Sequence, residues 1–352
     1  MATILDPPGS VARSDLRRLI AALDAAPFDY AAHPTAPGEE APSGGCTRQG
    51  RRRVAGRDVE HPVVVEVHKQ MGDRRRGFAG SGQAVALFIA TILERFDVIA
   101  TQELKHYTTA FKEIVTWLNR DTPGRWAFVI TDSTSGTAKL PTGAKNPGNY
   151  ERLGYLYDTN RVSFSVLAGE LVIPWHRFEA GEDLASEQFA RTPYAVSFAT
   201  AHGGHQFILL TVHVNYSARE LRAFEIREVA RWVFDWSNKA WAWDTDIIVL
   251  GDFNADRFDQ PNYRPFADRL HVPHDMGQFP RTIYKSGRDK HYDMVTWLKA
   301  GSGRPGGPGP DIQYLDTGYF DFTLVVLRNL NNDRLAARVS DHYPLWVRFS
   351  LA

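Results

Sequence analysis

The sequence contains a single cysteine, Cys46, in 352 residues, and therefore cannot form an intrachain disulfide. Chains with so little cysteine are typical of reducing compartments, so we expect a cytoplasmic location. The sequence also lacks any uninterrupted apolar stretch near the roughly 18 residues that a membrane-spanning helix needs. Its first residues show neither the basic start nor the apolar run of a secretory signal. We therefore expect neither a disulfide framework nor a membrane span.

Net charge of either sign is also missing, because 41 Lys and Arg residues balance 41 Asp and Glu residues. A balanced chain has no overall electrostatic attraction for nucleic acid, although a local basic patch remains compatible with it. With 43% hydrophobic and 23% charged residues, the composition is that of an ordinary globular protein. This composition excludes a disordered, collagen-like or coiled-coil chain.

Large apolar side chains are scarce at residues 31–59. Ser14 is placed to cap a short helix, and residues 31–59 are rich in Ala, Pro, Gly and Arg. From residue 61 onward, apolar segments follow one another closely. We therefore predict an N-terminal arm with a short helix and a flexible linker at 1–60, and a folded domain at 61–352.

Within this domain, β-branched runs alternate with segments that repeat apolar residues at helical spacing. Strands are predicted at 61–68, 97–103, 207–214, 246–254, 292–297 and 343–349. Helices are predicted at 84–96, at 105–120, and after a capping box formed by Ser217 and Glu220. Residues 154–166 alternate as in a β-hairpin. Helices and strands alternate at first and extended segments dominate later, which predicts a layered α/β or α+β domain.

Ionisable and polar residues lie repeatedly where the predicted strands begin or end. These positions are Glu103, His213, Asp252, Asn254, Asp293, Asp341 and His342. Strand ends meet at one edge of a packed sheet, where loops carry binding and catalytic groups. Asp252 and Asn254 are two residues apart and would face the same way if the chain stays extended there. We therefore expect these side chains to form one site.

The chemistry of this set favours a metal-assisted reaction. Carboxylate and amide oxygens are hard ligands, which suit Mg²⁺ or Mn²⁺ better than structural zinc. Imidazole titrates near neutral pH, so the two histidines suit proton transfer, and each needs a carboxylate to fix its tautomer. Glu151 and Asp293 are the carboxylates available for that purpose. A metal site beside such histidines is an arrangement for hydrolysis of a phosphate ester by water.

Six short segments occur in the order and spacing of a known family. They are TQE (101–103), YERLGYLYD (150–158), TVHVNY (211–216), GDFNAD (251–256), YDMV (292–295) and SDHYP (340–344). With these segments the chain resembles the endonuclease/exonuclease/phosphatase superfamily and, within it, the deoxyribonuclease I-like branch. The resemblance implies a four-layer sandwich of two packed mixed β-sheets flanked by helices. It also implies that 61–352 is the catalytic domain.

The resemblance assigns a role to individual residues. The catalytic set that it implies is His213, His342, Glu151, Asp293, Asp252 and Asn254, and the metal set is Glu103, Asp341 and Asp252. Glu151 would hold His213, and Asp293 would hold His342. The exonuclease III-like branch usually has Tyr where His213 stands, so His213 favours the deoxyribonuclease I-like branch.

Three further residues are candidates for binding the substrate phosphate, together with Asn254. Arg191 in FARTPYAV matches a family arginine, and its rigid fork suits a phosphate. Lys105 follows the metal Glu by two residues, although an ordinary lysine in a first helical turn explains it equally. The family's first strand normally ends in Asn, whereas here it ends in His68, with Lys69 or Gln70 as alternatives. An imidazole there would donate to phosphate or shift the metal preference toward Mn²⁺.

The sequence therefore predicts a Mg²⁺- or Mn²⁺-dependent phosphodiesterase, and more narrowly an endonuclease acting on nucleic acid, DNA in preference to RNA. Basic clusters at 48–57 and 73–77, and a loop at 133–149 with Lys139 and Lys145, favour a polyanionic substrate. Two alternatives stay open: a phosphatase or lipid phosphodiesterase with the same core, and a catalytically idle binding module. Nothing in the sequence indicates an oligomeric state.

Overall fold

The computed structural model describes residues 61–68, 81–105, 108–132, 151–174, 188–201, 204–216, 219–257, 263–287, 290–298, 312–324 and 330–351. The arm predicted at 1–60, the basic cluster at 73–77 and the loop at 133–149 lie outside these ranges. No helix within the described ranges is long and apolar enough to cross a membrane.

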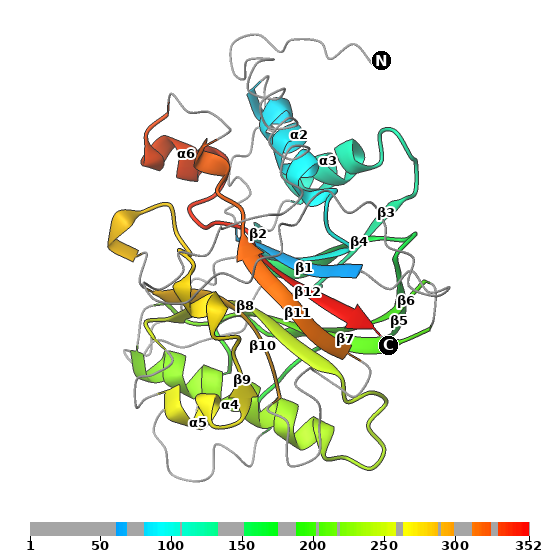
Figure 1. The fold of residues 1–352 in the computed structure, drawn as a ribbon, viewed down its shortest axis with the longest axis vertical. Coiled ribbons are helices and arrows are strands. Elements are labelled where there is room, and N and C mark those ends of the chain that lie inside the picture. Colours follow the sequence, from blue (N-terminus) through cyan, green and yellow to red (C-terminus); the bar gives the residue numbers. More distant parts are fainter. Residues whose placement is uncertain are drawn as a thin grey trace, which may run out of the picture.

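Two six-stranded sheets form the centre of the molecule (Figure 1). The first sheet has the order β11 (Ile312–Tyr319), β12 (Leu345–Leu351), β1 (His61–His68), β2 (Val98–Lys105), β4 (Glu151–Asp158) and β3 (Trp126–Ile130). The second has the order β5 (Val162–Glu170), β6 (Tyr194–Thr200), β7 (Gln206–His213), β8 (Ile247–Ala255), β10 (His291–Leu298) and β9 (Leu270–His271). Both sheets are mixed, because each contains one parallel pair among antiparallel ones.

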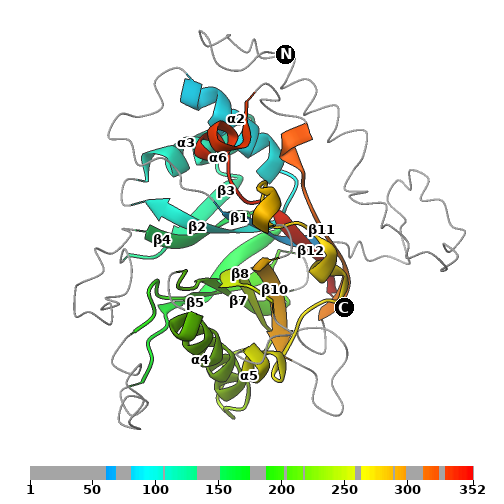
Figure 2. The same ribbon diagram turned by 90° about the vertical axis from the view of Figure 1, so that its left-hand side faces the viewer.

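Helices cover the outer face of each sheet, as Figures 1 and 2 show. The first sheet carries α2 (Ser81–Leu93), α3 (Thr109–Leu118) and α6 (Asn332–Arg338), and the second carries α4 (Arg219–Ser237) and α5 (Arg264–Ala267). Short 3₁₀ turns occur at η4 (Asp275–Gln278), η5 (Lys285–Gly287) and η6 (Phe322–Leu324). The arrangement confirms the predicted four-layer sandwich.

The central strands β2, β4, β7 and β8 are largely buried on both faces. In β2, Val98 belongs to the core between the two sheets, whereas its neighbour Ile99 packs with α2 and α3. In β4 the same alternation places Tyr155 between the sheets and Leu156 under the helices. Side chains of successive strand residues point to opposite faces, so one strand serves both layers of the core.

Each sheet contains one pair of parallel strands, and polar residues lie at the carboxyl ends of these strands. β1 and β2 run parallel with α2 between them in the chain, and β7 and β8 run parallel with α4 between them. Their carboxyl ends therefore lie together. His68 is in register with Gln102 in the first sheet, and His213 is in register with Asp252 in the second.

The six predicted strands are confirmed as β1, β2, β7, β8, β10 and β12. The first two helices are also present, but α2 begins and ends three residues before the predicted range, and α3 is shorter than expected. The third predicted helix is α4; Ser217 of its predicted capping box lies outside the described residues. Strands β3, β6, β9 and β11 were not predicted, because their segments lack the sustained apolar runs of the central strands.

The prediction of a β-hairpin at 154–166 is wrong. β4 pairs with β2 and β3 in the first sheet, whereas β5 pairs with β6 in the second. The turn between them is closed by the Arg161 amide, which donates to the Asp158 carbonyl at 2.9 Å. The Arg161 carbonyl in turn accepts from the amide of Ala201, at the end of β6, at 2.8 Å. Alternation alone does not say which sheet a strand joins, so the pattern fitted both arrangements.

Asp97, just before β2, gives the fold a measurable pH dependence. Burial raises the pKa of Asp97 to about 6, although the Arg161 guanidinium, 3.0 Å away, acts in the opposite direction. A raised carboxyl pKa stabilises the folded state below the unfolded pKa, and that stability is lost as the pH rises through about 6. We expect the free energy of unfolding of the wild type to fall relative to Asp97→Asn by up to about 3 kcal/mol between pH 4 and 7. Urea titrations of both proteins across this range would check it, and parallel curves would contradict it.

Candidate active site

Two histidine–carboxylate pairs bridge the two sheets. His213, at the end of β7, places Nδ1 3.1 Å from Oε2 of Glu151, at the start of β4. His342, just before β12, places Nδ1 2.6 Å from Oδ2 of Asp293 in β10. In each pair one member comes from the first sheet and the other from the second. The resemblance implied both pairings, and the structure places the two members of each pair in contact.

Asp252 of β8 lies between the two pairs. Strand register places it opposite His213 on one side and opposite Asp293 on the other. Its Oδ2 is 3.6 Å from Nε2 of His213, and its Oδ1 accepts the Asn254 amide at 2.7 Å. The central strand of the site therefore connects the two pairs.

Two groups of side chains have the composition and spacing of a cation site. One consists of Glu103, Glu151 and His213, and the other of Asp252, Asp293 and His342; in each, the ligand atoms lie within 4.8 Å of one another. Carboxylate oxygens are suitable donors for Mg²⁺ or Mn²⁺, whereas imidazole is more typical of sites for softer divalent metals. The residues present therefore fit a divalent cation. Asp341, expected beside Glu103, is half-buried and belongs to neither group among the residues that the structure describes.

Glu103 reaches this site through an irregularity of β2. The register between β2 and β4 shifts between Thr101 and Leu104, and Glu103 itself has a φ of 55°. A non-glycine residue in the left-handed region is strained, and such residues concentrate at functional sites. The bulge turns the Glu103 carboxylate toward Glu151 and His213.

Asn254 differs from the expectation that the chain stays extended after Asp252. Its φ is 47°, and its Nδ2 donates to the carbonyl of Val214 at 2.8 Å. Asn tolerates the left-handed region better than most residues, which explains why the chain turns at this position. An amide nitrogen carries two hydrogens, so one remains for a substrate oxygen.

Gly251 is required immediately before Asp252. Its φ is 137°, and an added Cβ would lie 2.1 Å from the backbone oxygen of Val212 on β7. Because the neighbour is backbone and cannot rotate away, we expect Gly251→Ala to lower the free energy of unfolding by about 3 kcal/mol or more. Gly169→Ala is the matched control, since a Cβ there meets nothing within 4 Å. Denaturant unfolding of both variants checks this, and equal stabilities would contradict it.

Arg191 lies against the first pair. Its Nε donates to Oε2 of Glu151 at 2.9 Å, the same oxygen that faces His213, and its Nη1 reaches the carbonyl of Val214 at 3.5 Å. The loop that carries it is fixed by buried Glu225 of α4, which accepts from the amides of Ala190 and Asn215, each at 3.0 Å. One carboxylate therefore holds the Arg191 loop against the end of β7.

The strand register of the backbone gives the positions of Lys105 and His68. Lys105 is the last residue of β2, in register with Glu151, so the alternative of a first-turn helix lysine is wrong. His68 ends β1 in register with Gln102, next to Glu103, which is the position where the family's Asn was sought. Gln102 also donates to the hydroxyl of Thr211 on β7 at 2.7 Å and so connects the sheets beside the site.

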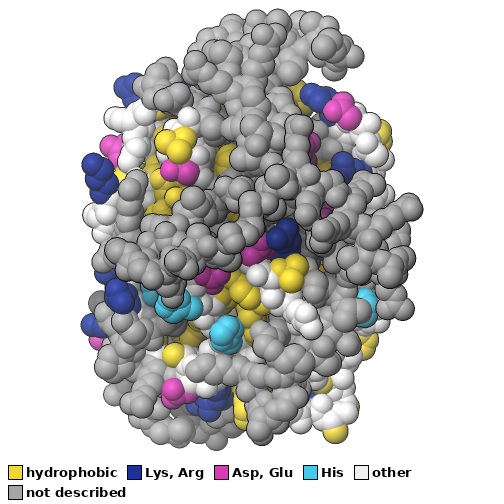
Figure 3. Space-filling model, viewed as in Figure 1, with side chains coloured by type: hydrophobic (Ala, Val, Ile, Leu, Met, Phe, Trp, Pro, Cys, Tyr) yellow, Lys and Arg dark blue, Asp and Glu magenta, His cyan; other side chains and the backbone are white. Residues whose placement is uncertain are grey.

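Tyr292 covers one side of His342. The two rings stack with centroids 5.6 Å apart and an interplanar angle of 25°. Burial raises the pKa of the Tyr292 hydroxyl, and Tyr216 and Asp252 nearby add to the effect. On the face shown in Figure 3, acidic (magenta) and histidine (cyan) side chains lie across the middle of the molecule, beside a basic (blue) one.

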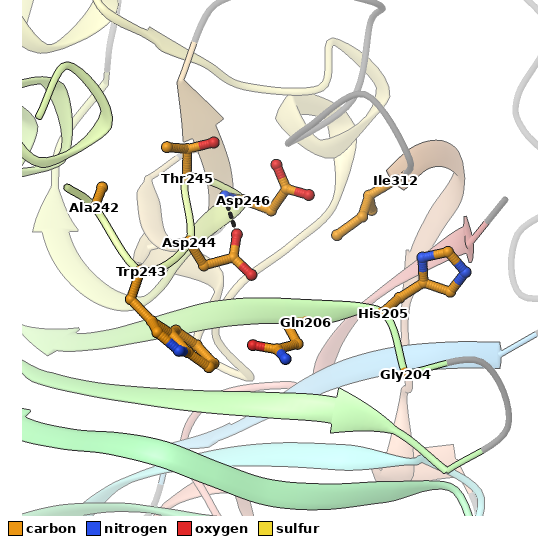
Figure 4. A pocket seen from close by; sticks show the side chains of 9 residues that line it. All are labelled: Gly204, His205, Gln206, Ala242, Trp243, Asp244, Thr245, Asp246 and Ile312. Carbon is orange, nitrogen blue, oxygen red and sulfur yellow. Dashed lines mark hydrogen bonds between the residues drawn. The ribbon is translucent and has the colours of Figure 1, made fainter. Parts of the chain in front are cut away.

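A separate hollow lies at the opposite edge of the second sheet, where β7 and β8 begin. Gln206, Trp243 and Asp244 line it, and Asp244 accepts the amide of Asp246 at 2.8 Å (Figure 4). His213 and Asp252 lie at the other ends of these strands. The hollow is therefore not part of the candidate active site.

Sequence reasoning missed the residues that hold the site in place. Glu225, Arg281, Thr282 and Gln102 were not singled out. Gln102 and Thr282 are uncharged polar residues, whereas Glu225 and Arg281 are buried charged residues. Buried charged residues are unusual. Whether a given charged residue is buried cannot be read from the sequence, because its burial depends on contacts with distant segments of the chain.

No family model matches the chain. Deoxyribonuclease-1 from Bos taurus is 24% identical over 278 residues, which cover 76% of this chain and 86% of that protein. Deoxyribonuclease-1 from Canis lupus familiaris is 26% identical over 280 residues, covering 77% and 87%. A deoxyribonuclease from Thioalkalivibrio sp. (strain K90mix) is 23% identical over 269 residues, covering 74% and 65%.

Solved structures share the fold. An endonuclease/exonuclease/phosphatase family protein from Bacteroides thetaiotaomicron aligns with a TM-score of 0.52 at 15% identity, covering 83% of this chain and 99% of its own. The human Nocturnin catalytic domain aligns with a TM-score of 0.51 at 16% identity, covering 83% and 95%. A mannosyl-6-phosphatase from Bacteroides thetaiotaomicron VPI-5482 aligns with a TM-score of 0.51 at 13% identity, covering 81% and 99%.

Proposed function

The chain belongs to the endonuclease/exonuclease/phosphatase superfamily and is deoxyribonuclease I-like, and from this premise we propose that it is a metal-dependent endonuclease of nucleic acid. Members of this superfamily are hydrolases of phosphoester bonds. The observation that carries the narrower proposal is the double bridge between the sheets, His213 with Glu151 and His342 with Asp293, on either side of Asp252.

In this proposal the two histidines divide the proton transfers. In each pair the carboxylate faces Nδ1 of the ring, so we assign the proton transfers to Nε2; in His213 this atom also lies 3.6 Å from Oδ2 of Asp252. His342, oriented by Asp293, accepts a proton from water as the water oxygen bonds to phosphorus. His213, oriented by Glu151, gives a proton to the leaving oxygen as the phosphorus–oxygen bond breaks. Each carboxylate fixes the tautomer of its histidine and stabilises the imidazolium.

The remaining residues bind and orient the phosphate. Asn254 donates an amide hydrogen to one phosphate oxygen, and Arg191 lies close enough to the first pair to supply a guanidinium to another. Asp252 orients the water and His213. A Mg²⁺ or Mn²⁺ ion held by Glu103, with Asp341 and Asp252 as further expected ligands, would neutralise charge on the phosphate and the leaving oxygen.

DNA is the proposed substrate, in preference to RNA. The support is that three similar proteins carry the name deoxyribonuclease. Lys105 and His68 lie at the strand ends that border the site, where they would contact the phosphate backbone. The boundary between an arm at 1–60 and a catalytic domain at 61–352, and the cytoplasmic location, remain part of the proposal.

A supercoiled-plasmid nicking assay tests this function. We expect open circles with Mg²⁺ or Mn²⁺ and none with EDTA, because the site needs a divalent cation. A matched RNA, a set of small phosphate monoesters and phospholipid vesicles would be run beside the plasmid. Hydrolysis of monoesters or lipids with an intact plasmid would favour the phosphatase or lipid phosphodiesterase alternative. No hydrolysis of any substrate by folded protein would favour the idle binding module.

A further inference from the structure

Arg281 is a buried arginine whose position calls for an explanation. Its residue is only 1% exposed, and it lies in the segment that follows η4 rather than in a strand. Burying a guanidinium costs several kcal/mol, and arginine does not lose its proton to escape that cost. Such a residue is retained where its hydrogen bonds fix a particular geometry, so the partners of its nitrogens are informative.

The guanidinium of Arg281 binds backbone next to the second catalytic pair. Its Nε donates to the carbonyl of Asp293 at 3.0 Å, and its Nη2 contacts Sδ of the following residue, Met294, at 3.6 Å. A third nitrogen, Nη1, donates to the carbonyl of Phe279 within the same segment. Through these bonds Arg281 connects the backbone of β10 at Asp293 to the segment 279–283.

Thr282, the next residue, donates a hydrogen bond to the backbone next to His342, the other member of the pair. Its hydroxyl donates to the carbonyl of Asp341 at 2.7 Å, which is the peptide unit that leads into His342. Thr282 and His342 also form a β-bridge. On either side of it, the Ile283 amide donates to Asp341 at 2.9 Å and the Tyr343 amide donates to Arg281 at 2.8 Å.

We propose that Arg281 and Thr282 are positioning residues that hold Asp293 and His342 in register across the two sheets. The inference rests on the proposed function, since it assigns the two residues to the pair that removes the proton from water. Arg281 fixes the backbone of the carboxylate partner and Thr282 fixes the backbone of the histidine. Neither touches the substrate. Because adjacent residues hold the two members, a displacement of either changes the 2.6 Å contact between Nδ1 and Oδ2.

Thr282→Val is the sharpest test, because it keeps the shape of the side chain and removes the hydroxyl. We expect kcat to fall on the order of 10- to 100-fold with KM nearly unchanged, since a small misplacement of a catalytic group is costly. Thr282→Ser restores the hydroxyl and is expected to recover most of kcat. Thr317→Val is the matched control: Thr317 is also buried and its hydroxyl donates to a backbone carbonyl, that of Trp346, at 2.6 Å. It lies away from the pair and should leave kcat unchanged.

A double substitution separates positioning from general damage to the fold. In a His342→Ala background, Thr282→Val is expected to lower kcat no further, because the residue that it positions is already absent. An additive loss would overturn the proposal, as would an unchanged kcat in Thr282→Val. If Thr282→Val does not fold, Arg281→Lys replaces it; Lys keeps the charge but cannot reach three acceptors at once, and the same losses are expected.

A measurement without turnover keeps the inference distinct from the proposed function. In the wild type the Nδ1 proton of His342, in a 2.6 Å contact with Asp293, is expected to resonate downfield in the proton NMR spectrum. Thr282→Val is expected to move that resonance upfield or broaden it, and Thr317→Val is not. An unmoved resonance overturns the positioning role even in an active enzyme. A shifted resonance in a protein that hydrolyses no phosphoester supports the positioning role and rejects the proposed function alone.

Discussion

We expect His342→Ala to lower the rate of the proposed metal-dependent plasmid nicking by on the order of 10²–10⁴, the contribution typical of a positioned general base. The substitution removes the imidazole that Asp293 holds at 2.6 Å and leaves no other histidine in that pair. Asp293→Asn is expected to cause a loss within the same range, because an amide favours the wrong tautomer of the ring. The measurement is the initial rate of nicking under saturating metal, with plasmid concentration varied to separate kcat from KM.

The double variant tests whether the two residues act as one unit. His342→Ala combined with Asp293→Asn is expected to be scarcely slower than His342→Ala alone, since Asp293 acts through the ring. His205→Ala makes the same chemical change at the opposite edge of the second sheet, where His205 lines the separate hollow of Figure 4. It should nick at the wild-type rate. Full activity in folded His342→Ala would remove this histidine from the mechanism.

Glu103→Gln has the second large effect, on metal activation. The substitution keeps the size of the side chain and removes one of the two carboxylates in the group that also contains His213. Changing a residue that merely supports a metal ligand costs roughly 10- to 100-fold in metal affinity, and we expect at least that much here. The metal concentration at half-maximal nicking should rise by this factor, and binding of Mn²⁺ measured by calorimetry without substrate should weaken in parallel.

Glu94→Gln provides the control for this experiment. Glu94 follows α2, is exposed, and lies outside both groups of potential ligands. Its substitution should leave the activation curve in place. If Glu103→Gln binds Mn²⁺ as tightly as the wild type, Glu103 is not a ligand. The second group, with Asp252 and Asp293, would then become the cation site to examine.

The central strands and the paired residues of the site could be predicted from the sequence because their signals are local. The runs at 207–214 and 246–254 have continuous apolar stretches, as expected for strands buried on both faces, and polar residues follow these stretches. The six short segments, in their order along the chain, indicated which residues form the two pairs. The hairpin prediction at 154–166 failed because the sheet that a strand joins depends on distant partners, here β2 and β6. Local alternation is identical in both cases.

The finer geometry of the site escaped prediction for the same physical reason. The turn at Asn254 depends on the Val214 carbonyl forty residues earlier, and the burial of Arg281 depends on β10 folding over it. Glu103 was placed correctly near a strand end, but its bulge arises from the register between β2 and β4. Each of these features is fixed by long-range hydrogen bonds.

The order in which the site's residues occur along the chain also has a consequence for when the protein becomes active. β12 inserts between β1, the first strand of the sheet, and β11, and His342 lies just before β12. During synthesis His342 therefore leaves the ribosome after every other residue of the two pairs. A nascent chain that has already folded its second sheet still has no His342 to pair with Asp293. If the protein has the proposed nuclease activity, we expect that activity to appear only when β12, the last strand, has completed the first sheet.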